Sequence, residues 1–302
     1  GKSKGVYSMA LSDYLREEIL EEADLGYIST EERDRKLAVL DGRMNSSGAH
    51  KEALMSAEPS GSKDPEFETG PNLYTAMASA KGERSDVLGY LAKPNQATNL
   101  PGVVVIHENK GLTPHIEDVA RRFAREGFVA IAPDLLSRKG GTSRFATPTD
   151  ATAALRDIPS GELDEDLMAT VSFLASDPSV NPENIAVVGF CFGGGMAWRL
   201  VTKDTRIKAA VPFYGVNPNL KYVPEIEAAV LAIYGELDER INAGIDEITQ
   251  AMEKANKTFK KIIYPGAQHA FHNDTNPDRY HPQAARQAWQ QTLDWLRQWM
   301  SK

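Results

Sequence analysis

The sequence contains a single cysteine among its 302 residues. One cysteine cannot form a disulfide within the chain, and by itself it cannot build a metal site from thiolates. Long apolar stretches are also missing, since no run approaches the roughly 20 residues that a membrane-spanning helix needs. These absences argue against a disulfide-stabilised fold, a thiolate metal cage and a transmembrane protein.

An excess of positive charge is absent as well. The formal net charge is −8 at pH 7, and lysines and arginines are interspersed with acidic residues, so we expect no nucleic-acid partner. The chain starts without an initiator methionine or a hydrophobic signal core. We therefore expect a soluble protein that is cytoplasmic by default, with export after removal of a signal peptide left open. With 41% hydrophobic and 25% charged residues, the composition is that of an ordinary globular protein.

The first 72 residues differ in character from the rest. Apolar residues recur at helical spacing between Leu11 and Met55, and STEE at Ser29–Glu32 is typical of a capping box that opens a second helix. The stretch from Ala57 to Asn72 is rich in proline, glycine, serine and charge, which predicts a linker or a long exposed loop. We expect an N-terminal helical extension and linker over residues 1–72 and a second domain over residues 73–302.

From about Asp86, short apolar runs alternate with amphipathic stretches. The runs are VLGYLAKP, GVVVIH, FVAIAPD, IAVVG, IKAAVPFYG, AVLAIYG and FKKIIYPGAQH. This alternation predicts an α/β fold with a mostly parallel central sheet and helices on both faces, and ligands bind at the carboxyl ends of such strands. VLGYLAKP ends at a proline and is interpreted as an edge strand. The C-terminal AARQAWQQTLDWLRQWM predicts an amphipathic helix with Ala288, Trp289, Leu293, Leu296 and Met300 near one face.

The single cysteine lies in IAVVGFCFGGGMAW, Ile185–Trp198. An apolar run ends at Gly189, Cys191 follows, and glycines precede a helix-forming stretch, which matches the G-x-nucleophile-x-G elbow between a strand and a helix. Glycines flank such a turn because the nucleophile adopts a strained backbone conformation and a neighbouring Cβ would clash. Free cysteines are often buried structural residues. The position between glycines after a strand favours a nucleophile instead.

A thiol with the ordinary pKa of about 8.5 is mostly protonated at neutral pH, so it needs a base that an acid orients. Asp238 in GELDERIN and His269 in GAQHAFHND each follow a predicted strand, and the order nucleophile, acid, histidine is that of α/β-hydrolases. Glu236 and Glu239 compete with Asp238 for the position of the acid. His269 could instead bind a metal with His272, but no further ligand follows at a suitable spacing. We expect a histidine base and no metal.

The segment VVVIHENKGL places His107 and Glu108 directly after the first strong central strand. The loop at this point usually supplies the second donor of an oxyanion hole, so we assign the two donors to the N–H groups of Phe192 and Asn109. A carboxylate beside a thiol can hold it protonated or accept its proton, which gives Glu108 a catalytic role. The alternative is a loop charge paired with Lys110.

At these positions the chain resembles the dienelactone hydrolase family, the branch of the α/β-hydrolase fold that uses a Cys-His-Asp triad. The resemblance rests on GFCFGGGMAW, GELDERI, GAQHAF and IHENKGL, with FVAIAPDLL and PFYG similar to intervening strands, over about residues 86–300. It implies that Cys191 attacks an ester or lactone carbonyl and that His269 acts as base and then as acid. Asp238 would orient the histidine, and Glu108 would modulate the resting thiol. The resemblance implies no metal or organic cofactor.

Two departures from the family pattern concern substrate binding. Members that act on dienelactone have an arginine a few residues after the histidine to hold the substrate carboxylate, whereas this chain has Asn273 near that place. The second such arginine comes from a region that differs here, where the candidates are Arg138, Arg144 and Arg156. We expect substrate contacts from Tyr214, His107 and Asn273.

The predicted function is a cysteine-dependent hydrolase whose partner is a small ester or lactone. Thioesters and larger acyl esters remain open, because the elbow does not specify the leaving group. A catalytically silent binding or structural module on the same fold and a thiol redox protein are the alternatives from other classes. The N-terminal helical segment has no counterpart in the minimal family domain. It could pack over the sheet, form a partial lid or make the contact of a homodimer.

Overall fold

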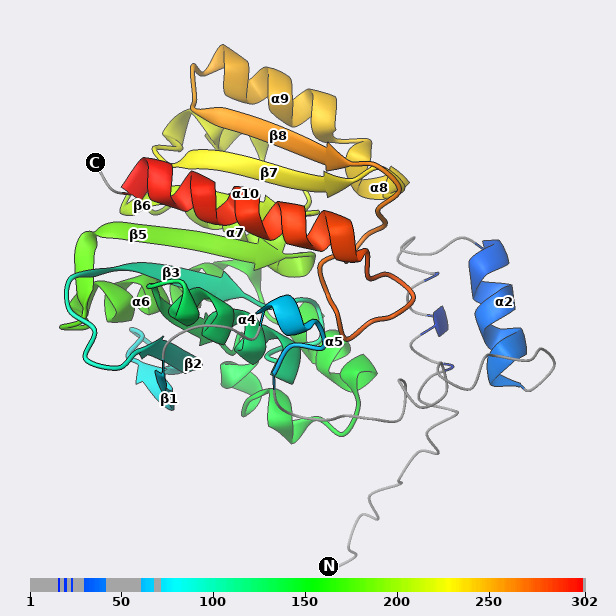
Figure 1. The fold of residues 1–302 in the computed structure, drawn as a ribbon, viewed down its shortest axis with the longest axis horizontal. Helices are drawn as coiled ribbons and strands as arrows, with labels where there is room; N and C mark the ends of the chain where they lie inside the picture. The colour runs from blue at the N-terminus through cyan, green and yellow to red at the C-terminus, as the bar shows by residue number, and fades with distance from the viewer. Residues whose placement is uncertain are drawn as a thin grey trace, which may run out of the picture.

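The computed structural model describes residues 30–41, 61–67 and 72–300, together with residues 16, 19, 20 and 23. These residues form an eight-stranded sheet with the order β1-β2-β4-β3-β5-β6-β7-β8 (Figure 1). β2 pairs antiparallel with β1 and with β4, and the other neighbours are parallel. The strands are β1 (Leu73–Ala80), β2 (Val87–Pro94), β3 (Leu100–Ile106), β4 (Val129–Pro133), β5 (Val180–Phe190), β6 (Ile207–Phe213), β7 (Ala229–Gly235) and β8 (Phe259–Tyr264).

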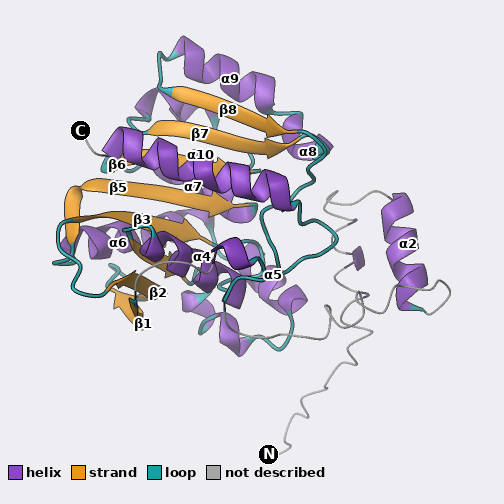
Figure 2. Ribbon diagram, in the orientation of Figure 1, coloured by secondary structure: helices purple, strands orange, loops and turns teal. Residues whose placement is uncertain are grey.

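Helices cover both faces of this sheet, as predicted (Figure 2). α4 and α10 lie on one face, where the rings of Phe123 and Trp289 are 4.5 Å apart, and α6 and α7 lie on the other, joined by the ion pair of Asp164 with Arg199. The α-helices are α2 (Thr30–Leu40), α4 (Pro114–Arg125), α5 (Pro148–Arg156), α6 (Ser160–Ser176), α7 (Phe192–Val201), α8 (Glu239–Asn242), α9 (Ile245–Lys254) and α10 (Pro282–Met300). Short 3₁₀ helices are η1 (Pro65–Phe67), η2 (Ser137–Lys139), η3 (Thr142–Arg144) and η4 (Leu220–Glu225).

The inner strands are apolar on both faces because helices cover both. Every residue of β4 and β7 is buried, whereas the edge strand β1 is mostly exposed or half-buried. Inner parallel strands therefore appear in the sequence as continuous apolar runs rather than as alternating patterns. The helix predicted at the C-terminus is α10, and its predicted apolar residues are all buried: Ala288, Trp289, Leu293, Leu296 and Met300.

The sheet begins one strand earlier than the sequence predicts. β1, with the sequence LYTAMASA, pairs along its whole length with β2, so VLGYLAKP is the second strand and its interpretation as an edge strand is wrong. β1 escapes prediction because it is rich in alanine and contains no long run of large apolar residues.

The N-terminal region is described only in part. α2 corresponds to the second predicted helix, whereas Ser29 and most of the first predicted helix lie outside the described residues. Within the predicted linker, residues 61–67 are described, and Asp64 and Phe67 are buried rather than exposed, with 5% and 7% of their surface accessible. This part of the segment therefore packs against the body that contains the sheet. In the described part of the chain, no helix has both the length and the apolar character to cross a membrane.

Candidate active site

Cys191 occupies a sharp turn between β5 and α7. Its backbone has φ 58° and ψ −117°, a left-handed conformation that costs a residue with a side chain about 1–3 kcal/mol. The flanking glycines are needed because of close backbone packing. A Cβ at Gly189 would lie 1.9 Å from the carbonyl oxygen of Gly193, and a Cβ at Gly193 would lie 2.3 Å from the carbonyl oxygen of Ile106. The predicted elbow is therefore present, with its thiol above the carboxyl edge of the sheet.

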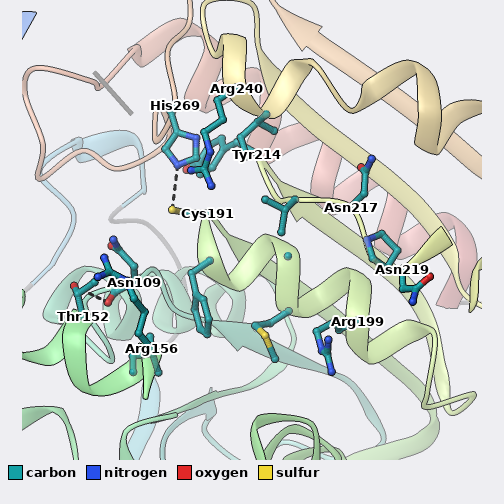
Figure 3. A pocket seen from close by; sticks show the side chains of 17 residues that line it. Asn109, Thr152, Arg156, Cys191, Arg199, Tyr214, Asn217, Asn219, Arg240 and His269 are labelled. Atoms are coloured by element: carbon teal, nitrogen blue, oxygen red, sulfur yellow. Dashed lines mark hydrogen bonds between the residues drawn. The ribbon is translucent and has the colours of Figure 1, made fainter. Parts of the chain in front are cut away.

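The structure brings the three predicted side chains of the triad together. Nε2 of His269 lies 3.0 Å from Sγ of Cys191, and Nδ1 donates to Oδ2 of Asp238 at 2.5 Å. Figure 3 shows the first of these contacts as a dashed line. Asp238 follows β7 and His269 lies in the loop after β8, so parallel strands deliver both residues to the edge where the elbow lies.

The competing acids are arranged differently. Glu236 accepts a hydrogen bond from the Gly266 N–H at 3.1 Å, and Glu239 is the first residue of α8 and is exposed. Only Asp238, among these three carboxylates, is bonded to the histidine and buried. Of the three carboxylates, Asp238 is the one placed to orient His269.

The charge state of His269 depends on its two neighbours. Burial by itself lowers the pKa of an imidazole, but the charge of Cys191 and the hydrogen bond to Asp238 overcome that effect and raise the pKa of His269 to about 10. A charged sulfur and the Asp238 carboxylate together therefore favour the protonated form of His269 at neutral pH. Because part of the increase comes from the sulfur charge, the pKa of His269 falls once the sulfur is neutral.

The backbone donors assigned to the oxyanion hole belong to residues that line the same cavity as the thiol. Phe192 is the first residue of α7, and the first N–H groups of a helix have no acceptor within the helix. Asn109 faces the cavity from the loop after β3, and its carbonyl oxygen accepts a hydrogen bond from Thr152 at 2.9 Å. Both residues are thus next to the place where a carbonyl attacked by Cys191 would develop negative charge.

Glu108 and Asn273 contact each other beside this cavity. Nδ2 of Asn273 donates to Oε1 of Glu108 at 3.1 Å, and the amide oxygen of Asn273 accepts from the N–H and hydroxyl of Thr275. The two bonds to Thr275 orient the amide so that its NH₂ group faces the carboxylate. Neither residue is among the described residues that line the cavity, and the amide that was expected to contact substrate is bonded to Glu108.

His107 is also not where a substrate-binding residue would be. The ring is fully buried, Nδ1 donates to the Glu108 carbonyl oxygen at 2.6 Å, and Nε2 accepts from the Leu135 N–H at 3.0 Å. The expectation of a substrate contact is therefore corrected: both ring nitrogens are occupied by backbone groups. Burial lowers the pKa of His107, which agrees with a neutral ring that donates at one nitrogen and accepts at the other.

Tyr214 does line the cavity. It follows β6 with a positive φ of 36°, and its ring centroid is 5.0 Å from that of His269. Burial, followed by the charges of Glu108 and Cys191, raises the pKa of Tyr214 well above its ordinary value. The hydroxyl therefore stays protonated and can act only as a neutral donor or acceptor at the site.

The cavity has a volume of about 350 Å³ and is lined by several cationic side chains (Figure 3). Of the arginines considered from the sequence, Arg156 lines it, whereas Arg138 is bound to Glu162, Glu165 and Asp166 and Arg144 is not part of the lining. Sequence reasoning missed Arg199 and Arg240, which also line the cavity. Arg240 could have been noticed, because it follows Asp238 closely in the acid loop.

The alternative of a metal site at His269 and His272 does not match the surroundings of His272. That ring is fully buried among aromatic rings, with centroids 5.2 Å from Phe190 and 5.3 Å from Phe213. In the described part of the chain, no group of three or more His, Cys, Asp or Glu side chains is arranged to hold a metal ion.

The chain is similar to known proteins of one family over most of its length. The sequence model of the "Dienelactone hydrolase family" matches residues 87–300. A "Putative carboxymethylenebutenolidase" of Yersinia pestis is 36% identical over 239 residues, which are 75% of this chain and 89% of that protein. A protein of the same name from Synechocystis sp. is 34% identical over 234 residues, 72% of this chain and 94% of that protein. The crystal structure of a "Putative Dienelactone Hydrolase" from Klebsiella pneumoniae has a TM-score of 0.70 and 30% identity, and covers 75% of this chain and 99% of that chain.

Proposed function

The chain belongs to the dienelactone hydrolase family, and we propose that it hydrolyses a small carboxylic ester or lactone through an acyl intermediate on Cys191. The observation that carries the proposal is the hydrogen-bonded series Cys191, His269, Asp238 at a strained elbow that opens into a cavity. The name carboxymethylenebutenolidase, borne by the relatives, denotes hydrolysis of a butenolide, which is a lactone. A cavity of about 350 Å³ fits a small substrate of this kind.

Acylation begins from the thiolate and the imidazolium. The Cys191 sulfur attacks the carbonyl carbon, a C–S bond forms, and the π electron pair moves to the carbonyl oxygen. The N–H groups of Phe192 and Asn109 stabilise this oxyanion. When the intermediate collapses, the bond to the leaving oxygen breaks, and His269 donates its proton from Nε2 to that oxygen.

Deacylation uses the change in charge that acylation causes. A thioester sulfur carries no charge, so the pKa of His269 falls and its Nε2 can accept a proton from water. The hydroxide attacks the acyl carbon, and collapse expels the Cys191 thiolate and releases the acid. Asp238 holds Nδ1 protonated throughout, which directs the free lone pair of Nε2 toward the site. Glu108, whose carboxylate accepts from Asn273, has the proposed role of modulating the resting thiol.

Burst kinetics with p-nitrophenyl acetate test this mechanism directly. We expect a burst of nitrophenol equal to the enzyme concentration and an acetyl adduct on Cys191 in the intact mass, both lost in Cys191→Ala. Asp238→Asn should lower kcat by about 10²–10⁴ because the histidine loses its orienting acid. Glu239→Gln is the matched control, because it removes an exposed carboxylate from the residue next to Asp238. Turnover that survives in Cys191→Ala would refute the covalent mechanism.

A further inference from the structure

The loop that carries His269 is held by a segment far upstream in the chain. We call residues 61–67 the upstream segment and residues 265–281 the histidine loop. The upstream segment lies before the range that the family model matches, residues 87–300. It nevertheless bonds to the histidine loop at Asp274 and at Tyr280. These contacts connect an element outside the hydrolase domain to the loop of the proposed base.

The first connection is made through Asp274, shortly after His269. Oδ2 of Asp274 accepts hydrogen bonds from the Ser62 hydroxyl, from the Asp64 N–H at 3.0 Å and from Nη2 of Arg122 at 3.1 Å. The side chains of Asp274 and Arg122 are each 1% exposed. Since buried charges are costly when one partner is removed, this cluster strongly favours one position of the loop.

The second connection is made through the side chains of Asp64 and Phe67. Oδ2 of Asp64 accepts from the Tyr280 hydroxyl at 2.6 Å and from Nη2 of Arg286 at 2.8 Å. The centroid of the Phe67 ring lies 6.0 Å from that of His272. The Arg122 guanidinium lies over the Phe67 ring, 4.3 Å from its centroid. The upstream segment thus contacts the middle and the end of the histidine loop.

The histidine loop needs such support because it contains no helix or strand. Ala270, next to His269, has φ 65°, a strained conformation that persists only where the surroundings enforce it. A few turns bond within the loop, such as the Asn273 N–H to the Ala270 carbonyl at 3.1 Å. The position of Nε2 relative to the thiol therefore depends on side-chain contacts with other elements.

We propose that the upstream segment is a positioning element for His269: Ser62 and Asp64 hold the histidine loop so that Nε2 stays within reach of Cys191. The proposal rests on the proposed function, because the segment acts through the histidine. Catalytic groups must be held within about 0.5 Å of their productive geometry, so loosening the loop affects the thiolate before it affects the fold.

The test compares the variants Ser62→Ala, Asp64→Ala and their combination with wild type. The rate of alkylation of Cys191 by iodoacetamide is measured against pH, together with kcat and KM for p-nitrophenyl acetate. Iodoacetamide reacts with the thiolate, so the alkylation rate reports how well His269 stabilises the ionised sulfur. These substitutions do not change the other titratable groups around Cys191 and His269, which are Asp238, Glu108 and Tyr214.

In the double variant we expect alkylation at pH 6 to be about 10-fold slower and kcat about 10-fold to 100-fold lower, with KM unchanged. The midpoint of the alkylation profile should move to higher pH while its alkaline plateau is kept. Glu66→Gln is the matched control, since Glu66 is exposed and its carboxylate pairs with Arg286. It should behave as wild type.

Two results would overturn the proposal. One is a folded double variant with the wild-type alkylation midpoint. The other is loss of the folded state in Ser62→Ala alone, which would make the segment part of the folding core. A merely structural role would lower the amount of active protein without moving the midpoint. Alkylation requires no ester hydrolysis, so failure of the proposed function, seen as a missing acyl adduct in wild type, is a separate result.

Discussion

His107 donates a hydrogen bond from Nδ1 to the carbonyl oxygen of Glu108, and this bond orients the N–H of Asn109. The carbonyl of Glu108 and the N–H of Asn109 belong to the same peptide group. Because this peptide is trans, its C=O and N–H point in opposite directions, so fixing the carbonyl also fixes the N–H. The His107 ring also stacks on the ring of Phe192, with centroids 6.1 Å apart. One buried histidine therefore contacts both segments that we propose as oxyanion donors.

Replacing His107 should lower the rate of chemistry rather than substrate binding. His107→Phe keeps a ring against Phe192 but removes the bonds to the Glu108 carbonyl and the Leu135 N–H, so we expect kcat to fall by about 10²-fold with KM little changed. His107→Asn keeps a donor near the position of Nδ1 and should lose less activity. Steady-state kinetics on p-nitrophenyl acetate check both variants, and equal rates in the two would argue against control of the oxyanion donor.

The proton on His269 should depend on the thiolate. In wild type the pKa of His269 is about 10, so acylation is expected to decline as the pH rises through that value. In Cys191→Ala the charge of the sulfur is gone, and the pKa of His269 should fall. An NMR titration of the imidazole measures this, and a pKa unchanged by the substitution would contradict the ion pair.

The same shift affects stability. Because the folded pKa of His269 lies above the ordinary value of 6.5, its stabilising contribution is complete below pH 6.5 and is lost as the pH rises through about 10. Denaturant titrations of wild type and Cys191→Ala at pH 6 and pH 10 measure the free energy of unfolding. The decrease in this free energy between pH 6 and pH 10 should be smaller in the variant. A loss of equal size in both proteins would assign the alkaline destabilisation to other groups.

The elbow glycines should not tolerate a methyl group. In Gly193→Ala the new Cβ would lie 2.3 Å from the Ile106 carbonyl oxygen, a backbone atom that cannot rotate away, so we expect loss of several kcal/mol of stability or of the folded protein. Gly161→Ala is the control, because that position in α6 has nothing within 4 Å. It should be neutral or stabilising by about 0.5–1 kcal/mol. Thermal unfolding of the two variants makes the comparison.

His272 should make the folded state sensitive to acid. Burial, with the charges of Arg122 and His115, lowers the pKa of His272 well below 6.5, so the unfolded chain binds a proton that the folded chain does not. Stability should therefore fall as the pH drops below 6.5, by at most about 1.4 kcal/mol per pH unit from this residue. Urea unfolding at pH 7.5 and pH 5 should show a smaller difference in His272→Phe, and an undiminished difference would place the effect elsewhere.

Several features could be predicted because their physical requirements are local. The elbow is encoded by Gly189 and Gly193, since the turn at Cys191 leaves no room for their side chains. Asp238 and His269 could be selected because each follows a predicted strand of the parallel sheet, and parallel strands end at one edge. The strand β1 could not be found, because its pairing with β2 stabilises a segment with little intrinsic β preference.

Other features depend on which side chains meet in space. A histidine and an asparagine next to catalytic loops suggested substrate contacts, but His107 faces the backbone and Asn273 faces Glu108. The orientation of a loop side chain is set by packing between elements, and a local pattern does not contain that information. Arg199 and Arg240 were missed because the sequence does not show which residues of α7 and α8 face the cavity.

The sequence by itself determined the alternation of strands and helices, the turn that presents Cys191 and the residues available as its acid and base. These follow from apolar periodicity and from the small space that a glycine needs. Only the tertiary structure decided that a polar segment which looks like a linker packs Asp64 and Phe67 against the histidine loop. The carboxylate of Asp64 and that of Asp274 in the loop are stable there because they meet partners from α4, α10 and the loop, and most of those partners are distant in the chain.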